Sequence, residues 1–232
     1  MRFLKKSRVP PKKFTKLINK VICTDGNNGY ESLAGESKAD VIEILVNEQN
    51  GLCVYCNQKI STKSATIEHF LCQSHNPMLD LNYHNLYAVC KGNDGQKNAS
   101  HCDKYRANVA GNDYFLPFFM FDNCLTINWD QINPFFDIEF NRKLGLVSGK
   151  IIARESNIKA YPPIKQRIEY TIKTLNLNTQ ILIDARKFKW EEVLRTRNDF
   201  SYSWEDLFRY YLEMHSYTDF YEFVLLAIRK QI

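Results

Sequence analysis

No stretch of the sequence approaches the roughly 18 consecutive apolar residues that a membrane-spanning helix needs. The opening residues, MRFLKKSRVPPKK, also lack the apolar core of a secretory signal peptide. Internal repeats and low-complexity segments are absent as well. These absences argue against a membrane protein and against a repeat array, and we expect a cytoplasmic protein.

An even cysteine count, as in a disulfide framework, is also lacking. The seven cysteines form an odd set in a chain without a secretion signal, which favours reduced or metal-bound thiols. The 232 residues are 44% hydrophobic and 25% charged, as in ordinary globular proteins, and they suffice for one moderate domain or two small ones. The net charge of +5 permits a nucleic-acid partner without requiring one.

Acidic residues are missing from the first twenty positions, which carry eight lysines and arginines. We expect residues 1–35 to form a basic N-terminal arm that can lie on phosphates. A solvated tail, or a surface that pairs with an acidic partner, is the alternative. The apolar residues Val41, Ile44 and Leu45 then recur at helical spacing, so a helix is predicted from Ser37 to about Gly51.

The segment 53–100 is polar and rich in Gly and Asn, and it looks unable to form a conventional core, so a metal is expected to replace hydrophobic burial there. Beyond residue 108 the character changes. Residues 114–140 are aromatic, which suits base stacking or, preferably, a core and partner-binding face. A strand at FDIEF and a return strand at LVSGKIIA are predicted, followed by helical periodicity from Pro163 onward, over 180–197 and over 203–231.

Four cysteines have spacing that suits a structural zinc. Cys53 and Cys56 form a C-x-x-C knuckle, and Cys90 and Cys102 can complete a tetrahedral four-sulfur site, although eleven residues separate that second pair. A redox pair at Cys53 and Cys56 is disfavoured because no βαβ pattern lies nearby. The three further cysteines, at positions 23, 72 and 124, are interpreted as small buried residues. Of these, Cys72 is a reserve ligand.

A carboxylate–histidine pair follows the knuckle. Glu68 and His69 lie in an alternating IEHF stretch, which sends neighbouring side chains to opposite faces unless the strand ends and bends there. Phosphodiester hydrolysis needs a base and a cation, and an imidazole suits the first role because its pKa is near neutrality. His69 is therefore the candidate general base. Glu68 is a candidate metal ligand or a group that orients His69.

Further candidates surround this pair. Asn85 is expected to hold the facing loop by amide hydrogen bonds and so fix the imidazole. The residues DKYRAN after Cys102 predict the first turns of a helix. Asp103 and Asn108 can present oxygen to the catalytic cation, and His101 competes for that role. The remaining assignments are phosphate contacts for Lys104 and Arg106, a loop anchor for Asp80, and surface positions for His75 and His84.

Together the motifs C-x-x-C, E-H, N-L-x-x-x-C and H-C-D resemble an HNH endonuclease of the ββα-metal type with a cysteine staple. The resemblance implies an α+β fold, namely a ββα-metal core with a structural zinc over residues 36–112. It implies a mainly helical C-terminal region over 113–232. Asp103 departs from the pattern, because many HNH enzymes have His or Asn there. That departure leaves the third catalytic metal ligand open between Asp103, His101 and Asn108.

The likeness extends to the N-terminal M-R-x-x-x-K-x-x-x-P, to IEHF and to T-L-N-L-N-x-x-x-L-x-x-x-R. These phrases resemble the PtuB-like nuclease subunits of Septu-type anti-phage systems, including retron-associated ones. The resemblance implies Zn²⁺ as a structural ion, Mg²⁺ or another divalent cation for catalysis, and a PtuA-like SMC/ABC-type ATPase partner. It implies DNA or, for retron-linked members, tRNA as substrate, with a retron reverse transcriptase and its msDNA as further partners. The rival reading is a catalytically inactive, zinc-stapled nucleic-acid-binding or ATPase-regulating adaptor.

Overall fold

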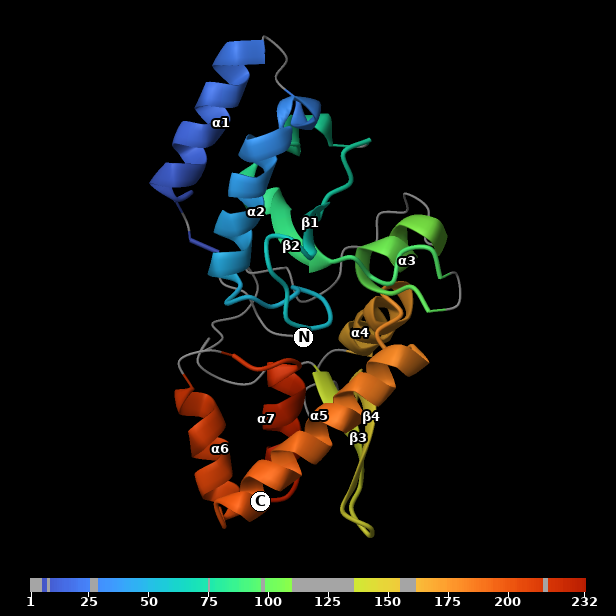
Figure 1. Cartoon of the computed structure of the whole chain (residues 1–232). Helices are drawn as coiled ribbons and strands as arrows, with labels where there is room; N and C mark the ends of the chain where they lie inside the picture. The colour runs from blue at the N-terminus through green and yellow to red at the C-terminus, as the bar shows by residue number, and fades with distance from the viewer. Residues whose placement is uncertain are drawn as a thin grey trace.

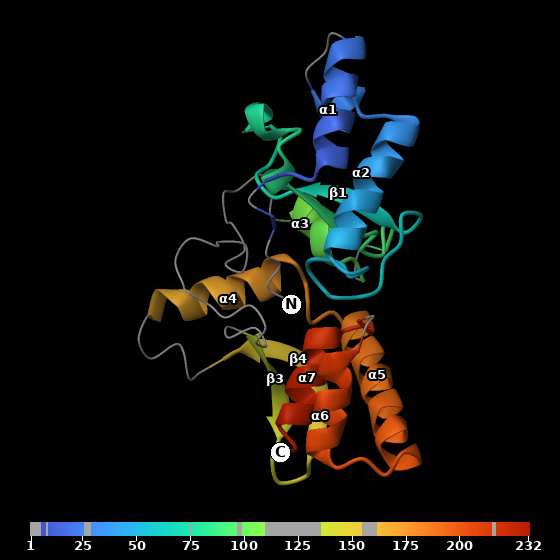
Figure 2. The ribbon, with the colours of Figure 1, turned by 90° about the vertical axis from the view of Figure 1, so that its left-hand side faces the viewer.

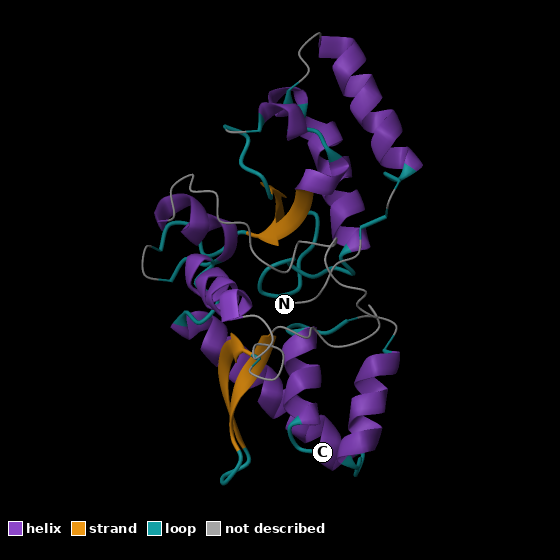
Figure 3. Ribbon diagram, turned by 180° about the vertical axis from the view of Figure 1, so that it is seen from behind, coloured by secondary structure: helices purple, strands orange, loops and turns teal. Residues whose placement is uncertain are grey.

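Two small antiparallel hairpins, each accompanied by helices, organise the described chain as a mixed α+β protein (Figures 1 and 3). The computed structural model describes residues 6–7, 9–25, 29–74, 76–96, 99–109, 136–154, 162–214 and 217–232. We call residues 6–109 the N-terminal lobe and residues 136–232 the C-terminal lobe. The two lobes lie one above the other, and helix α4 (Pro162–Thr174) projects sideways beneath the N-terminal lobe (Figures 1 and 2).

The N-terminal lobe contains three helices around one hairpin. Its elements are α1 (Lys12–Asp25), α2 (Gly35–Glu48), β1 (Ala65–His69), β2 (Leu86–Cys90) and α3 (Cys102–Val109), with short 3-10 turns at Tyr30–Ser32, Pro77–Leu79 and Tyr83–Asn85. Helix α1 packs on α2, and α2 covers the hairpin. Strands β1 and β2 pair in a regular register, with Ala65 opposite Cys90 and His69 opposite Leu86.

The C-terminal lobe pairs a twisted hairpin with four helices. Its elements are β3 (Phe136–Asn141), β4 (Leu146–Ala153), α4 (Pro162–Thr174), α5 (Gln180–Asp199), α6 (Trp204–Glu213) and α7 (Tyr221–Arg229). Helix α5 approaches β4 closely at Gly149, whose φ is +82° and where a Cβ would lie 2.6 Å from the carbonyl oxygen of Ile183. Only glycine fits this contact without moving the helix.

Backbone hydrogen bonds join the two lobes beside the cysteines. The Cys102 amide donates to the Leu175 carbonyl at 2.8 Å, and the Phe220 amide donates to the Asn57 carbonyl at 2.8 Å. The side chain of Asn176 adds a bond of 2.9 Å to the Ser100 carbonyl. The lobes therefore meet where the cysteine-bearing loops lie.

The predicted basic arm is largely folded structure in the described residues. Lys12–Asp25 is helix α1, with Phe14, Ile18 and Val21 buried against α2. Lys6 is buried as well: its ammonium pairs with Glu48 at 3.2 Å, and burial lowers its pKa to about 8. At least this part of the predicted arm is used for folding, because its apolar face and Lys6 are inside.

The helix predicted from Ser37 begins two residues earlier, at Gly35, which has a φ of +53°. No side chain caps its first turn. Its end agrees with the prediction, since Gly51 has a φ of +71° and donates to the Val46 carbonyl at 2.8 Å. The predicted hairpin is confirmed as β3 and β4, but the periodic stretch 203–231 is two helices, α6 and α7. Most of the aromatic segment 114–140 lies outside the described residues.

The expectation that residues 53–100 cannot form a core is wrong. Val54, Tyr55, Leu86, Ala88 and Val89 are all buried, and they belong to the same hydrophobic cluster as α2. The prediction failed because polar residues concentrate in the loops of this segment, whereas its knuckle and β2 are apolar. A metal ion held by the cysteines would therefore add to a hydrophobic core rather than replace it.

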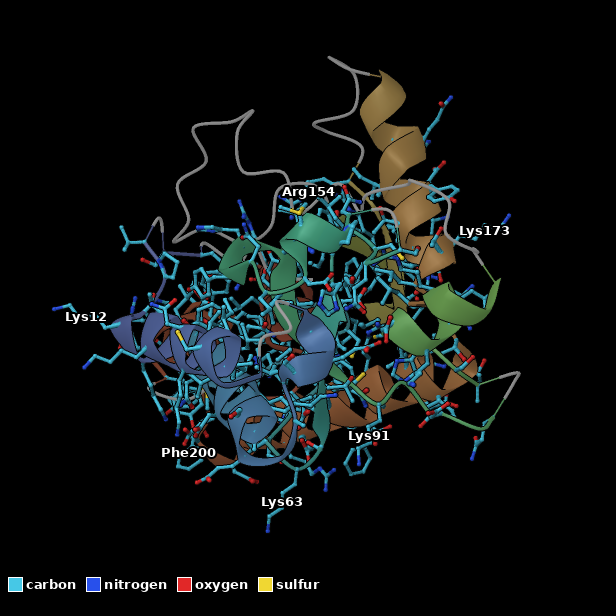
Figure 4. The ribbon with its side chains drawn as sticks, turned by 90° about the horizontal axis from the view of Figure 1, so that it is seen from above. Lys12, Lys63, Lys91, Arg154, Lys173 and Phe200 are labelled. Atoms are coloured by element: carbon cyan, nitrogen blue, oxygen red, sulfur yellow. The ribbon has the colours of Figure 1, made fainter. Side chains whose placement is uncertain are left out.

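Exposed lysines are spread over the surface. Lys12, Lys63 and Lys173 point outward on three sides of the molecule in the view from above (Figure 4).

No helix within the described part of the chain is both long and apolar enough to cross a membrane.

Candidate metal centre and catalytic site

The four predicted cysteine ligands converge. The sulfur atoms of Cys53, Cys56, Cys90 and Cys102 all lie within 4.8 Å of one another, and those of Cys56 and Cys90 are 3.7 Å apart. A tetrahedral zinc site with Zn–S bonds of about 2.3 Å places its sulfurs about 3.8 Å apart. The cluster can therefore hold a metal ion such as zinc. Elsewhere in the described ranges, no other set of three or more Cys, His, Asp or Glu side chains converges in this way.

Tight backbone turns shape both halves of the cluster. After Cys56 the chain turns at Asn57, whose φ is +62° and whose amide donates to the Cys53 carbonyl at 3.0 Å. The second half closes a longer loop, in which the His101 amide donates to the Gly92 carbonyl at 3.0 Å. A Cβ at Gly92 would collide with the His101 carbonyl oxygen, and φ there is +58°. This closure brings Cys90 and Cys102 together across their eleven-residue gap.

His101 lies at the sulfur cluster. Its Nδ1 is 3.2 Å from the Cys102 sulfur and 3.8 Å from the Cys90 sulfur, and the residue is buried. Burial raises the pKa of the Cys56 thiol, but hydrogen bonds from the other three thiols and His101 outweigh burial and hold it well below its ordinary value. One thiol is thus readily ionised, as a metal ligand must be. His101 consequently supports the thiolates and is not positioned as a ligand beside Glu68.

Glu68 belongs to a buried polar cluster at the end of β1. Its Oε1 accepts a hydrogen bond from the Tyr55 hydroxyl at 2.7 Å and forms an ion pair with Arg106 Nη1 at 2.5 Å. Arg106 Nη2 also donates to the Phe70 carbonyl at 3.0 Å. Arg106, predicted to meet phosphates, is therefore committed to Glu68 and to the strand end.

Asp103 completes this cluster from the first turn of α3. Burial raises the pKa of Glu68 well above its ordinary value. The charge of Asp103 and a hydrogen bond with it raise this pKa further, whereas Arg106 and Tyr55 lower it by a smaller amount. Two neighbouring carboxylates repel each other unless a proton or a cation lies between them. Tyr55 and Arg106 both contact Oε1 of Glu68, so a cation bound through Oε2 would take the place of the hydrogen bond between Glu68 and Asp103.

His69 is the last residue of β1, and it is held on two sides. Its Nε2 donates to the Asp80 carbonyl at 2.9 Å, while the Tyr30 ring meets the imidazole edge-on at 4.5 Å. A carbonyl can only accept, so Nε2 carries the proton and Nδ1 of the neutral ring carries the lone pair. Burial lowers the pKa of His69, although the Asp80 carbonyl and the charge of Asp103 raise it. The imidazole is thereby kept neutral near pH 7.

Asn85 ties the loop after β1 to the start of β2. Its Oδ1 accepts from the Leu71 amide at 2.7 Å, and its Nδ2 donates to the Leu71 and Leu79 carbonyls at 3.1 Å each. The Asn85 carbonyl also accepts from the Phe70 amide at 2.9 Å. Asn85 thus fixes the chain on both sides of the loop that carries the Asp80 carbonyl to His69.

Glu68 and Asp103 interact by a hydrogen bond and by charge, and the charge of Asp103 also acts on His69, the next residue of β1. The ligand atoms of these three residues do not converge on one point as the four sulfurs do. Lys104 instead forms a surface pair with Asp94 at 3.2 Å. The side chain of Asn108, like His75, lies outside the described part of the chain, and His84 is exposed as expected.

The sequence reasoning missed three groups that complete this site. Tyr55 lies inside the C-x-x-C knuckle, and Tyr30 comes from the segment that was predicted to form a basic N-terminal arm. Asp80 contributes its carbonyl oxygen to His69, and its carboxylate accepts from the Tyr30 amide at 3.5 Å. A backbone carbonyl leaves no signal in a sequence. The aromatic residue between the two cysteines was the one available signal, because large apolar side chains next to a metal knuckle are often buried.

No protein-family model matches the chain, and the search of curated proteins finds no match.

Proposed function

We propose that the chain is a metal-dependent nuclease of the HNH type, which hydrolyses phosphodiester bonds with His69 as general base. The observation that carries the proposal is the interaction of Glu68 with Asp103 from the first turn of α3, with His69 following Glu68 at the end of β1 and four clustered cysteines beside Asp103 in the chain. A hairpin followed by a helix, with these residue types at its end, is the arrangement that the HNH resemblance implies.

In this proposal, His69 Nδ1 accepts a proton from the attacking water, since Nε2 is occupied by the Asp80 carbonyl. Asp103 and Glu68 Oε2 offer hard oxygen ligands, the donor type that Mg²⁺ prefers, and one or two carboxylates suffice when water and substrate phosphate supply the rest. A divalent cation held there would supply the charge that stabilises the leaving oxygen. Arg106 and Tyr55 orient Glu68 by binding its other oxygen.

The wider biological role rests on the resemblance to PtuB-like subunits. We propose an effector of an anti-phage complex with a PtuA-like SMC/ABC-type ATPase, and with a retron reverse transcriptase and its msDNA in retron-linked systems. The substrate is DNA, or tRNA in those systems. Support comes from the IEHF phrase, which contains the candidate base, and from the TLNLN phrase, which begins at the end of α4 and leads into α5.

The substitution His69→Ala tests the catalytic proposal. We expect cleavage of plasmid DNA or tRNA, assayed with Mg²⁺ or Mn²⁺ alone and with the ATPase, to fall by about 10²–10⁴-fold, as for loss of a general base. Folding and zinc content, measured by circular dichroism and metal analysis, should not change. His84→Ala is the matched control, because His84 is exposed and next to Asn85. Equal cleavage by H69A and the wild type would contradict the mechanism.

An adaptor without hydrolytic activity is the second candidate. The observation that favours it is the ion pair of Arg106 with Glu68, since it engages a carboxylate that a cation would use. The same assays separate the two candidates. If the chain is an adaptor, the wild type should cleave neither nucleic acid even with the ATPase present. It should instead change the rate of the ATPase, and H69A should change that rate to the same extent as the wild type.

A further inference from the structure

Arg186 is a fully buried cation in the middle of α5, with too few partners of its own. Its Nη1 donates to the Leu177 carbonyl at 2.7 Å and to the Gly149 carbonyl at 3.2 Å. Its Nε and Nη2 are buried and have no hydrogen-bond partner. None of the ion pairs formed by the described residues includes Arg186. Its guanidinium carbon also lies 5.5 Å from the centre of the Phe220 ring. Two carbonyls and a ring face do not neutralise a buried guanidinium, so its charge needs an explanation.

The surroundings of Arg186 lead to the cysteine cluster. Arg186, Cys56, Asn57 and Phe220 line one cavity of about 10 Å³, which is room for no more than one water molecule. The Asn57 Oδ1 atom is also buried without a partner on this side. The cavity is too small for a metabolite, and hence Arg186 does not mark a ligand pocket. Burial lowers the pKa of Arg186 to about 10. The negative charges of Cys56 and Cys102 oppose this effect and raise the pKa.

A zinc ion with four thiolates carries a net charge of about −2, since two positive charges meet four negative ones. Such a centre inside a protein requires compensating hydrogen bonds or cations around its sulfurs. His101 supplies a hydrogen bond on the side of Cys102 and Cys90. Arg186 lies on the side of Cys56, and it comes from the other lobe.

We propose that Arg186 is the counter-charge of a zinc–tetrathiolate centre, and that zinc thereby holds the C-terminal lobe against the N-terminal lobe. The lobe-joining bonds of Cys102 to Leu175 and of Phe220 to Asn57 lie next to the ligands on both halves of the cluster. The metal centre is thus a joint between lobes in addition to a staple within one. This role is independent of the nuclease proposal, because it concerns only the sulfur cluster and α5.

The test compares Arg186→Met in the full chain with the wild type, with and without zinc. Zinc affinity, measured by competition with a chromophoric chelator, should fall about 10–100-fold, the usual cost of losing a supporting contact to a metal site. The effect of the substitution on the melting temperature should depend on zinc. R186M should melt lower than the wild type with zinc, and equal or higher without it, because the unpaired buried cation is gone.

Arg197→Met is the matched control, since Arg197 lies on the same helix with its guanidinium 4.3 Å from the Trp204 ring centre. R197M should keep the zinc affinity of the wild type and shift the melting temperature equally in both metal states. Arg186→Lys separates charge from shape: it keeps a cation and should lose at most a few-fold in affinity.

Hydrogen exchange gives an independent readout of the joint. In R186M with zinc, the amides of Phe220 and Cys102 should exchange faster than in the wild type, because they form the bonds between lobes. Unchanged zinc affinity in R186M, or an equal loss in R186K and R186M, would overturn the proposal. So would a destabilisation by R186M that is the same with and without zinc. These readouts do not involve cleavage, so their failure would leave the nuclease proposal standing.

Discussion

The sulfur cluster and the carboxylate–histidine cluster are built from the same segment, yet they differ in the chemistry of their ligand atoms and in how completely they are enclosed. Four sulfurs close around one point, and among these cysteines only Cys90 has some exposure. Glu68, His69 and Asp103 offer oxygen and nitrogen, and His69 and Asp103 are only partly buried. A closed set of ligands suits a structural ion, whereas an open one leaves room for water and substrate.

The comparison teaches how one segment can carry two centres. Two members of the carboxylate cluster are chain neighbours of the cysteines: Tyr55 lies between Cys53 and Cys56, and Asp103 follows Cys102 directly. Fixing the sulfurs therefore fixes the position of the carboxylate cluster as well. Loss of the first centre should destroy the second, but loss of the second should leave the first intact.

Cys56→Ser is expected to have the largest effect of the changes that test this asymmetry. Structural zinc contributes on the order of 10 kcal/mol or more in small metal-stabilised domains, and Cys56 lies at the centre of the cluster and at the joint between lobes. We expect lost zinc binding, a melting temperature well below that of the wild type, and local loss of structure around the cluster by circular dichroism. Cys72→Ser, outside the cluster, should keep both zinc and fold. A C56S variant that binds zinc normally would break the comparison.

Asn85→Ala should have an intermediate effect. Removing three side-chain hydrogen bonds, and leaving Leu71 and Leu79 backbone groups unpaired, should lower the free energy of unfolding by about 2–4 kcal/mol in urea titrations. Zinc should remain bound, while cleavage should fall because the Asp80 carbonyl no longer holds His69.

The control is Asn82→Ala, which removes a single bond to the exposed His84 amide and should cost about 1 kcal/mol. Equal losses in the two variants would show that Asn85 has no special role in the loop.

The smallest expected effect is on the pH dependence of cleavage. A general base works in its neutral form, and burial lowers the pKa of His69 below its ordinary value of 6.5. Activity should therefore stay level from neutral pH down through about pH 6.5 and fall only below that, when the imidazole is protonated. A cleavage rate that keeps rising between pH 7 and pH 8 would contradict this expectation, because it would mean that the group controlling the rate is still protonated at neutral pH.

Much of this architecture could be predicted from the sequence, because it follows from local patterns. The knuckle at Cys53, the β3–β4 hairpin and the helix after Cys102 each have a clear spacing or periodicity. What could not be predicted depends on contacts between distant segments. The ion pair of Arg106 with Glu68 spans 38 residues, and Arg186 approaches Cys56 from another lobe.

The role of Lys6 shows the same limit. In the sequence it is one member of a basic run, and exposed lysines are the rule. In the fold, its Nζ donates to the Tyr83 carbonyl at 2.8 Å and lies 3.8 Å from the Tyr83 ring centre. Charge patterns predict where cations occur along the chain, but only the tertiary structure decides which of them are buried.

The most direct test of two separate metal centres is the binding of Mn²⁺ to the zinc-loaded protein, followed by electron paramagnetic resonance. We predict that the wild type binds Mn²⁺ without releasing zinc, that Asp103→Asn weakens Mn²⁺ binding at least about tenfold, and that the exposed control Asp94→Asn does not. If D103N bound Mn²⁺ as tightly as the wild type, or if Mn²⁺ bound only by displacing zinc, the second centre would not be where Glu68 and Asp103 meet.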